Sequence, residues 1–278
     1  MSAGPVQRNR VSTGSVFSST LLGEAVARLL EGAEGPVADV GCGEAPYRGL
    51  LGAGPRVGID RSVPSEAGAV DAVGDAQAVP LRSGAFRTVL CTEVIEHVPD
   101  ERRLVAELTR LAGPGGRLVL SSPFVHGLHE EPHDYRRLTS IGLVAVLEEH
   151  GWRVDRVVAV GGVGVVTVDS GVRWVDTTVR RVIRRVAGRD SSALRSAARV
   201  SARVQRWLAT AASARGSVVD VDPSRPSPRL TLGYVVGATA PSAPVAYAPE
   251  PRSSGRAGTP PTRDLGSTSE TTTAPAAT

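Results

Sequence analysis

The sequence contains no lysine, and all 32 of its basic residues are arginine. The formal net charge is only +4. Because arginine occurs along the whole chain together with abundant Ala, Gly and Val, we interpret this composition as a coding bias and not as a nucleic-acid footprint. We therefore expect no nucleic-acid partner.

Cysteine and long apolar runs are also scarce. Two cysteines, Cys42 and Cys91, cannot form a disulfide framework, and both lie at the ends of expected buried strands, so we expect reduced core residues. The longest apolar run, residues 157–168, is interrupted by glycines and is too short to cross a bilayer. The first 15 residues lack the apolar segment of a signal peptide. These absences predict a cytoplasmic location.

The length of 278 residues suits one domain with tails, and its 41% apolar and 22% charged residues are those of a globular chain. We expect disorder in residues 1–15 and in the Pro/Ser/Thr/Ala-rich residues 240–278, which contain little apolar surface to bury. Residues 16–239 would form the domain.

Short apolar segments alternate with helical patterns along this domain. Strands are expected at residues 37–41, 56–60, 69–73, 87–92, 117–121, 153–160 and 230–236. An amphipathic helix over residues 21–30 precedes the first strand, and a second helix begins after Asp100 and ends at Gly113. A third is capped by Thr139, with Ile141, Val144 and Leu147 expected to face inward. This alternation predicts a doubly wound, mostly parallel α/β sheet.

Residues 161–229 interrupt the alternation and predict a helical insertion before the last strand. Valines recur at helical spacing between residues 172 and 186, the other side carries five arginines between residues 173 and 185, and a second helix is expected over residues 192–214. The basic face suggests contact with an acidic substrate or an anionic membrane surface. The simpler alternative is a solvated helix docked on the domain.

The strongest local signal is the segment ADVGCGEAPY, residues 38–47, in which a buried strand runs into two glycines and a helix start. Ligands of doubly wound sheets bind at the carboxyl ends of the strands, where glycines let the backbone approach them. Asp60 ends the next strand, where a carboxylate can accept both ribose hydroxyls of a nucleoside. Asp75 and Ala76 follow the third strand, where they could recognise an adenine amino group and ring nitrogen.

These segments, VADVGCGEAPY, VGID, GDAQAVPL, TEVIEHV and LAGPGGRLVLSSP, resemble in order and spacing the class I S-adenosylmethionine-dependent methyltransferases, and within them the type 11 small-molecule group. The resemblance covers residues 17–160. It implies S-adenosyl-L-methionine as cofactor and a seven-stranded sheet in the order 3-2-1-4-5-7-6 with the last strand antiparallel. One departure is Ala45, where many relatives have a third glycine.

The resemblance also implies roles for individual residues. Asp39, Gly41, Cys42 and Gly43 would shape the methionine pocket. Asp60 would bind the ribose, with Arg61 beside the adenine; Asp75 and Ala76 would hold the adenine, and Thr92 and Glu93 would close over the cofactor.

The loop after the fifth strand, residues 122–139, is rich in histidine and acidic residues and should overhang the methyl end of the cofactor. His133 and Asp134 are the first candidates for a catalytic base or for orienting the acceptor, followed by His126 and His129. Alternatively, Asp134 and Tyr135 only brace the following helix. We interpret His97 as a packing residue and expect no metal site, because the three loop histidines lie on a loop that contains glycine and proline and have no cysteine partner.

We therefore expect a methyltransferase that acts on a small-molecule, glycan-linked or lipid-linked acceptor, most often at oxygen. A protein that binds the cofactor without catalysis is the first alternative. A dinucleotide-dependent oxidoreductase is disfavoured, since its fingerprint needs a third glycine where this chain has Pro46.

Overall fold

The computed structural model describes residues 15–52, 54–63, 68–187, 192–222 and 230–243. All of them belong to one compact unit, residues 1–247. Most of the two tails expected to be disordered lies outside the described residues. Ala240, assigned to the C-terminal tail from sequence, is buried, and its N–H donates to the carbonyl of Gly116 at 2.7 Å.

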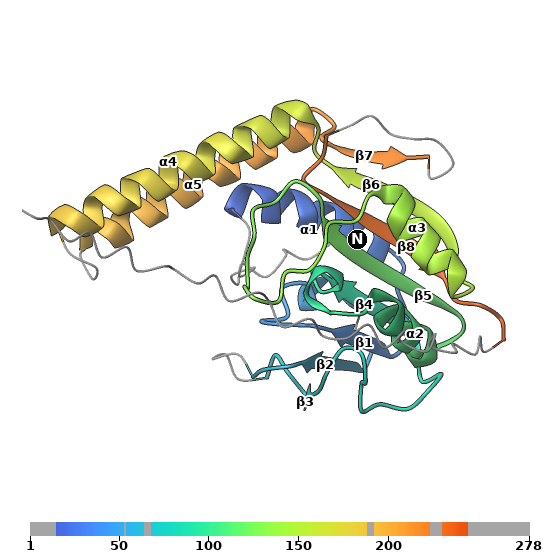
Figure 1. The fold of residues 1–278 in the computed structure, drawn as a ribbon. Coiled ribbons are helices and arrows are strands. Elements are labelled where there is room, and N and C mark those ends of the chain that lie inside the picture. Colours follow the sequence, from blue (N-terminus) through green and yellow to red (C-terminus); the bar gives the residue numbers. More distant parts are fainter. Residues whose placement is uncertain (1–14, 53, 64–67, 188–191, 223–229, 244–278) are drawn as a thin grey trace, which may run out of the picture. The chain divides into compact units, whose positions relative to one another are not determined.

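The described strands form one sheet of eight strands in the order β3-β2-β1-β4-β5-β8-β6-β7 (Figure 1). Their bounds are β1 Val37–Val40, β2 Arg56–Asp60, β3 Ala72–Val73, β4 Phe86–Thr92, β5 Ala112–Pro123, β6 Arg153–Val160, β7 Val218–Val221 and β8 Gly233–Thr239. Strands β1 to β5 pair in parallel, whereas β8 is antiparallel to both β5 and β6. The doubly wound fold and the antiparallel last strand are thereby confirmed.

The described sheet differs from the expected one by an eighth strand. The last strand, expected at residues 230–236, lies at Gly233–Thr239, and the third, expected at residues 69–73, is shortened to Ala72–Val73. Strand β7 pairs antiparallel with β6 at the sheet edge and lies within the segment expected to be wholly helical. Its four residues, Val-Val-Asp-Val, are too few to show a period, so the sequence pattern could not distinguish them from the end of a helix.

Helices cover both faces of the sheet. Helices α2 Glu101–Leu111 and α3 Ser140–Glu149 contribute to one buried cluster, and α1 Val16–Leu30 contributes to the other. Alternate strand residues serve the two clusters: Val89 and Cys91 join the first, and Leu90 joins the second. Both cysteines are buried and free, as expected. Two short 3-10 turns, η1 Arg48–Leu50 and η2 Ile95–His97, follow β1 and β4.

The expected helix starts are confirmed by their caps. The side chains of Asp100 and Thr139 accept hydrogen bonds from the backbone N–H of Arg103 and Gly142, respectively, at 3.0 Å. The inward face expected for α3 is wrong at one position, because Ile141 is 53% exposed. Leu143 and Val146 are buried in its place. The helix is apolar on almost every side, so its sequence carried no clear period.

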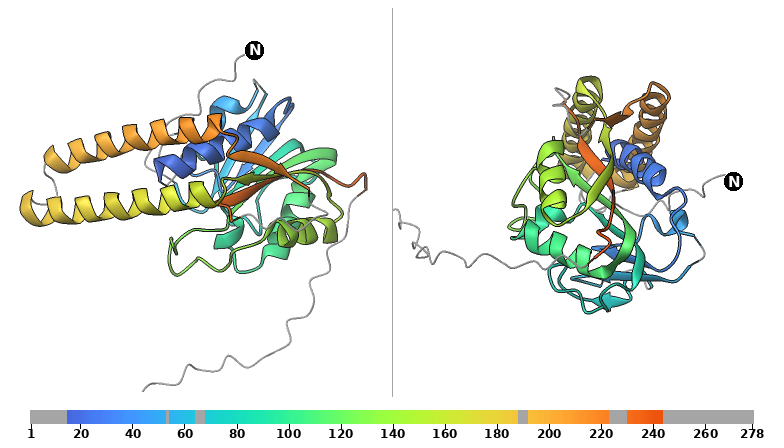
Figure 2. Two further views of the ribbon diagram at one scale, coloured as in Figure 1. Left: turned by 90° about the horizontal axis from the view of Figure 1, so that it is seen from above. Right: turned by 90° about the vertical axis from the view of Figure 1, so that its right-hand side faces the viewer.

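The insertion forms two long helices, α4 Val163–Ala187 and α5 Ser192–Ala214, which lie side by side (Figures 1 and 2). The buried residues of α4, Val166 and Asp169, lie near its start, and those of α5, Gln205 and Ala209, lie near its end. Helix α5 also contacts α1. Among the described residues, no helix combines the length and apolarity that a membrane span requires.

Candidate cofactor and active site

The ends of β1, β2 and β4 border a cavity of about 570 Å³ at the carboxyl edge of the sheet. Nine of the ten residues predicted to bind a cofactor line it: Gly41, Cys42, Gly43, Asp60, Arg61, Asp75, Ala76, Thr92 and Glu93. The structure therefore brings together residues that lie up to 52 positions apart in the sequence. Parallel strands place their carboxyl ends at one edge, and this is why the positions converge.

The glycine loop after β1 depends on backbone conformations that favour glycine. Gly41 has φ +72°, and a Cβ atom there would lie 2.2 Å from Cγ2 of Val94. At Gly43, φ is +49° and an added Cβ would meet nothing within 4 Å, so the backbone itself borders open space. Ala45 has φ +52°, a conformation that glycine adopts more readily than alanine.

Asp60 links the glycine loop to the end of β2. Its Oδ2 accepts a hydrogen bond from the N–H of Gly43 at 2.9 Å, and its Oδ1 accepts one from the N–H of Ser62 at 3.0 Å. The carboxylate is thus fixed by backbone donors at the cavity wall. A fixed carboxylate at this position can accept the vicinal hydroxyls of a ribose.

Asp75 and Ala76 form a tight turn on the opposite wall. The Oδ1 of Asp75 accepts a hydrogen bond from the N–H of Gln77 at 2.9 Å, and the carbonyl of Asp75 accepts from Ala78 at the same distance. This Asx turn holds the backbone of Ala76 at the cavity, where a planar base could lie against it.

Asp39, the tenth predicted residue, is not among the described residues that line the cavity. It is buried in β1, and its Oδ2 lies 3.3 Å from both Nε and Nη2 of Arg56. Burial raises its pKa to about 6, an effect that Arg56 opposes in part. This ion pair joins β1 to β2 just before the glycine loop.

Glu93 lies at the end of β4 in an uncommon backbone conformation, with φ +54°. Its Oε1 accepts a hydrogen bond from the hydroxyl of Ser121 at 2.8 Å, and its N–H donates to the same hydroxyl at 3.0 Å. Burial raises the pKa of Glu93 to about 7, while the Ser121 hydrogen bond and Arg137 lower it. A non-glycine residue held at positive φ beside a cavity is typical of functional sites.

Of the four candidate catalytic residues, His133 is the one that lines the cavity among the described residues. Its Nδ1 lies 3.1 Å from the hydroxyl of Tyr135, which also borders the cavity. The backbone N–H of Tyr135 donates to the carbonyl of Glu96 at 2.8 Å, so this part of the loop is anchored to η2.

Asp134 has contacts that suit a bracing role. Its side chain is buried, forms two hydrogen bonds with the guanidinium of Arg137, and accepts the backbone N–H of His129 at 3.0 Å. The Arg137 hydrogen bonds hold the pKa of this carboxyl well below its usual range. A carboxylate stabilised in its charged form is a weak proton acceptor, so His133 is the better candidate for a base.

His126 and His129 lie behind the cavity wall. Their rings are in edge contact with centroids 4.6 Å apart, and His129 makes a similar contact with His97. Burial lowers the pKa of both His126 and His129, so both imidazoles are neutral near pH 7.

Two residues of η2 were missed by the sequence analysis as site residues. His97, interpreted there as a packing residue, lines the cavity, and Glu96 is fully buried next to it. Burial and the neighbouring Glu93 raise the pKa of Glu96 well above its usual value. The segment TEVIEHV contained both residues, but no spacing rule indicated that the distant residue His129 would lie beside them.

A family model described as a methyltransferase domain matches residues 38–120 of the chain. Norajmaline N-methyltransferase of Rauvolfia serpentina is 44% identical over 50 residues, which are 18% of this chain and 17% of that protein. The tRNA (carboxymethyluridine(34)-5-O)-methyltransferase alkbh8 of Xenopus tropicalis is 36% identical over 129 residues, 41% of this chain and 20% of that protein. This chain thus matches a fifth or less of the length of these relatives.

A solved structure, that of the 4+2 cyclase SpnF, superposes with a TM-score of 0.50 over 86% of each chain at 16% identity, and so shares the fold. The family match spans the glycine loop, Asp60, Asp75 and Glu93, the residues that border the cavity. Residues 38–120 of the chain are therefore similar to a methyltransferase domain, and this matched stretch carries the cofactor-side wall of the cavity.

Proposed function

We propose that the protein transfers a methyl group from S-adenosylmethionine to a hydroxyl oxygen of a small-molecule, glycan-linked or lipid-linked acceptor. The convergence of nine predicted residues on one cavity carries this proposal. The donor set fits the cofactor, since Asp60 can accept the ribose hydroxyls and the turn at Asp75 and Ala76 can hold the adenine. The cofactor supplies a methyl group already activated on its sulfonium.

The protein then has to hold the acceptor in line and take up one proton. His133 would accept the proton that the acceptor hydroxyl gives up when it receives the methyl group. His133 borders the same cavity as Glu93 and His97, and this placement suits an acceptor bound at that end. Orientation alone supplies much of the rate, so removing His133 should lower kcat without abolishing it.

The first experiment is calorimetric titration of S-adenosylhomocysteine into the wild-type protein and into Asp60→Ala and Asp60→Asn. We expect micromolar binding that weakens about tenfold or more in both variants, because each removes the negative charge that accepts the hydroxyls. The matched control is Asp220→Ala, which removes an exposed carboxylate on β7 and should leave affinity unchanged. Absence of binding to the folded wild-type protein would contradict the proposal.

Two alternatives remain open to the same assay. A cofactor-binding protein without methyl transfer would bind S-adenosylhomocysteine and methylate no acceptor in a screen. The structural neighbour SpnF is described as a cyclase, so proteins with this fold can have other activities. A dinucleotide-dependent oxidoreductase would bind nicotinamide cofactors in place of S-adenosylhomocysteine.

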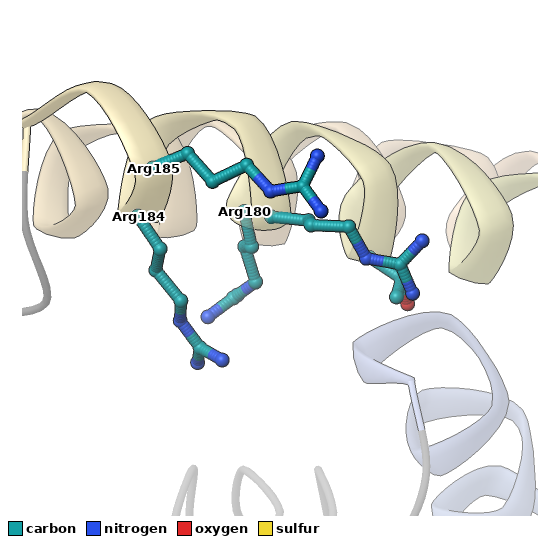
Figure 3. A pocket seen from close by; sticks show the side chains of 5 residues that line it. Arg180, Arg184 and Arg185 are labelled. Atoms are coloured by element: carbon teal, nitrogen blue, oxygen red, sulfur yellow. The ribbon is translucent and has the colours of Figure 1, made fainter.

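The hairpin α4–α5 supports a membrane-proximal acceptor. Together its two helices contain nine arginines and two aspartates, a net charge of +7, whereas the whole chain carries +4. The net positive charge is therefore concentrated in the hairpin. This differs from the even distribution of arginine that the composition suggested. Figure 3 shows Arg180, Arg184 and Arg185 extending from one stretch of α4 around a surface hollow.

Large apolar side chains are exposed on the same helices. Trp174 is 70% exposed and Val186 83% exposed, and Val175, Val179 and Val182 continue this exposed surface along α4. An amphipathic helix with arginines and exposed tryptophan and valine suits the interface of an anionic bilayer, where the arginines meet phosphates and the apolar side chains enter the acyl region. We propose that the hairpin binds such a surface.

Flotation with vesicles of phosphatidylcholine containing 30% phosphatidylglycerol tests this proposal against pure phosphatidylcholine. We expect binding to the anionic vesicles alone, weakened by high salt and by Arg184→Gln/Arg185→Gln. The control pair Arg102→Gln/Arg153→Gln removes two exposed arginines outside the hairpin and should bind as the wild type does. Binding to RNA with no binding to vesicles would overturn the membrane proposal.

A further inference from the structure

The carboxylate of Glu96 is buried, and no hydrogen bond to it is found among the described residues. The exposed fraction of Glu96 is 0%. A buried carboxylate without a donor is costly, and native structures pair such a group with a donor or a metal ion. The atoms around the carboxylate of Glu96 therefore indicate which ligand it could bind.

Two imidazole nitrogens face this carboxylate. The Nε2 atoms of His97 and His129 lie 3.5 and 3.9 Å from Oε1 of Glu96, and the three ligand atoms all lie within 4.8 Å of one another. The Nε2 of His129 also has no hydrogen-bond partner among the described residues. One carboxylate and two imidazoles thus converge on one point from η2 and from the loop after β5.

The Nδ1 atom of each histidine has a contact that fixes the orientation of its ring. The Nδ1 of His97 lies 2.8 Å from the carbonyl oxygen of His133, and that of His129 lies 3.2 Å from the carbonyl of Gly127 and 3.3 Å from Oδ2 of Asp134. Carbonyls accept only, so each Nδ1 carries a hydrogen, and each ring turns its Nε2 atom toward Glu96. Histidines that bind metals are oriented by this kind of carbonyl or carboxylate contact.

Three potential metal-ligand atoms therefore lie close together. The two separations fit a shared metal ion, because ligand atoms about 2.1 Å from a tetrahedral ion lie about 3.4 Å apart. Two histidines and one carboxylate make up a frequent ligand set for catalytic zinc and for open transition-metal sites. The set also leaves at least one coordination position for another ligand.

We propose that Glu96, His97 and His129 bind a divalent transition-metal ion at the wall of the cavity. His97 itself lines that cavity, so the open coordination position is available to an oxygen of the acceptor. Resting on the proposed function, this site narrows the acceptor to a hydroxyl compound that can coordinate a metal. A bound divalent ion lowers the pKa of a coordinated hydroxyl and so eases its loss of a proton to His133.

The expectation of no metal site is based on the three loop histidines, His126, His129 and His133. The structure brings a different set together. It pairs one loop histidine with two residues of η2, which precede it by more than 30 positions.

The test is binding of Zn²⁺ and Co²⁺ to protein without a histidine tag after dialysis against a chelator. Titration calorimetry with Zn²⁺ and the visible spectrum of the Co²⁺ form should both show one site per chain. We expect Glu96→Gln and His129→Ala to weaken binding tenfold or more, whereas His133→Ala, a cavity histidine outside the ligand set, should bind normally. Glu96→Gln preserves the shape of the side chain and removes a group that is costly to ionise when buried, so it should fold.

Titration of S-adenosylhomocysteine into the same samples separates this proposal from the proposed function. Cofactor binding without a metal site would overturn the metal proposal alone, and the unpartnered carboxylate would then be held by a shared proton. Metal binding that is equal in the wild type and in Glu96→Gln would also overturn it, since the ion would then occupy another site.

Discussion

Gly41 is a residue whose absent side chain decides the geometry of the cofactor loop. Its φ of +72° is strained for any other residue, and its Cβ position lies 2.2 Å from Val94. We predict that Gly41→Ala costs about 2 kcal/mol or more of unfolding free energy and weakens S-adenosylhomocysteine binding, because either Val94 or the loop must shift. Urea unfolding and calorimetry measure the two effects.

Gly32 supplies the matched control for this prediction. It has φ +70°, but an added Cβ would meet nothing within 4 Å. Gly32→Ala should therefore show the backbone strain alone, about 1 kcal/mol, with normal cofactor affinity. If Gly41→Ala/Val94→Ala is no more stable than Gly41→Ala, the contact with Val94 is not the cause.

We predict that Asp39 makes the stability of the folded state depend on pH with a sign opposite to that of an ordinary ion-paired aspartate. Burial raises its pKa from 3.8 to about 6, so the folded state binds the proton more tightly than the unfolded state does. Its contribution to stability is present below about pH 4 and is lost as the pH rises toward about 6. Relative to wild type, Asp39→Asn should therefore gain stability between pH 4 and 7, by about 3 kcal/mol at most.

Denaturant unfolding of wild type and variant at several pH values measures this difference in stability, in which the contributions of the other titrating groups cancel.

Asp220 is the counterpart, since its hydrogen bonds with Arg156 lower its pKa. The stabilisation from Asp220 is present at neutral pH and is lost as the pH falls, so the cost of Asp220→Asn should shrink on acidification. A flat profile for Asp39→Asn would mean that Arg56 fully offsets the effect of burial.

At the scale of elements, Arg136 fastens the loop after β5 to the turn η2. Its guanidinium donates to the carbonyls of Ile95, Val98 and Pro99 and lies 3.0 Å from a carboxylate oxygen of Glu101. We predict that Arg136→Gln lowers stability by about 1–3 kcal/mol and raises amide hydrogen exchange over residues 124–139, because three carbonyls lose a charged donor. Exchange in α1 should not change.

Arg102→Gln is the control for Arg136→Gln, since the ion pair of Arg102 with Glu149 is exposed. Its cost should stay below about 0.5 kcal/mol. Faster exchange that spreads through the whole chain, and not through the loop alone, would show that Arg136 supports the core and does not act as a local clamp.

Elements with a clear period were predictable, and contacts between distant loops were not. The strands that carry Gly41, Asp60 and Glu93 were identified because apolar runs end in glycine or acidic residues. Helix α3 lacked a distinct apolar stripe, so Ile141 was misplaced. The cluster of Glu96, His97 and His129 depends on how the long loop folds back over η2, and single-sequence patterns carry no information about that path.

On the scale of the whole molecule, charge and packing divide the chain into two parts. The sheet and the helices that cover it contain the cavity, whereas α4 and α5 contain the excess of arginine and most of the large exposed apolar side chains. The buried residues of the hairpin lie near its base, at Val166, Asp169, Gln205 and Ala209. Beyond these positions, its described residues add little to the core.

This division predicts that cofactor binding and vesicle binding can be separated by mutation. Replacing residues 176–203 by a four-residue Gly/Ser linker removes the outer part of both helices and keeps their buried base. We predict that the shortened protein keeps its melting temperature within about 3 °C and its affinity for S-adenosylhomocysteine and for Zn²⁺, because the residues removed contact neither cavity nor core. It should no longer float with anionic vesicles, since seven of the nine arginines and four of the eight exposed valines of the two helices are removed with the segment. Loss of cofactor affinity in a protein that still melts cooperatively would show instead that the hairpin forms part of the acceptor and cofactor site, and would place the membrane proposal in doubt.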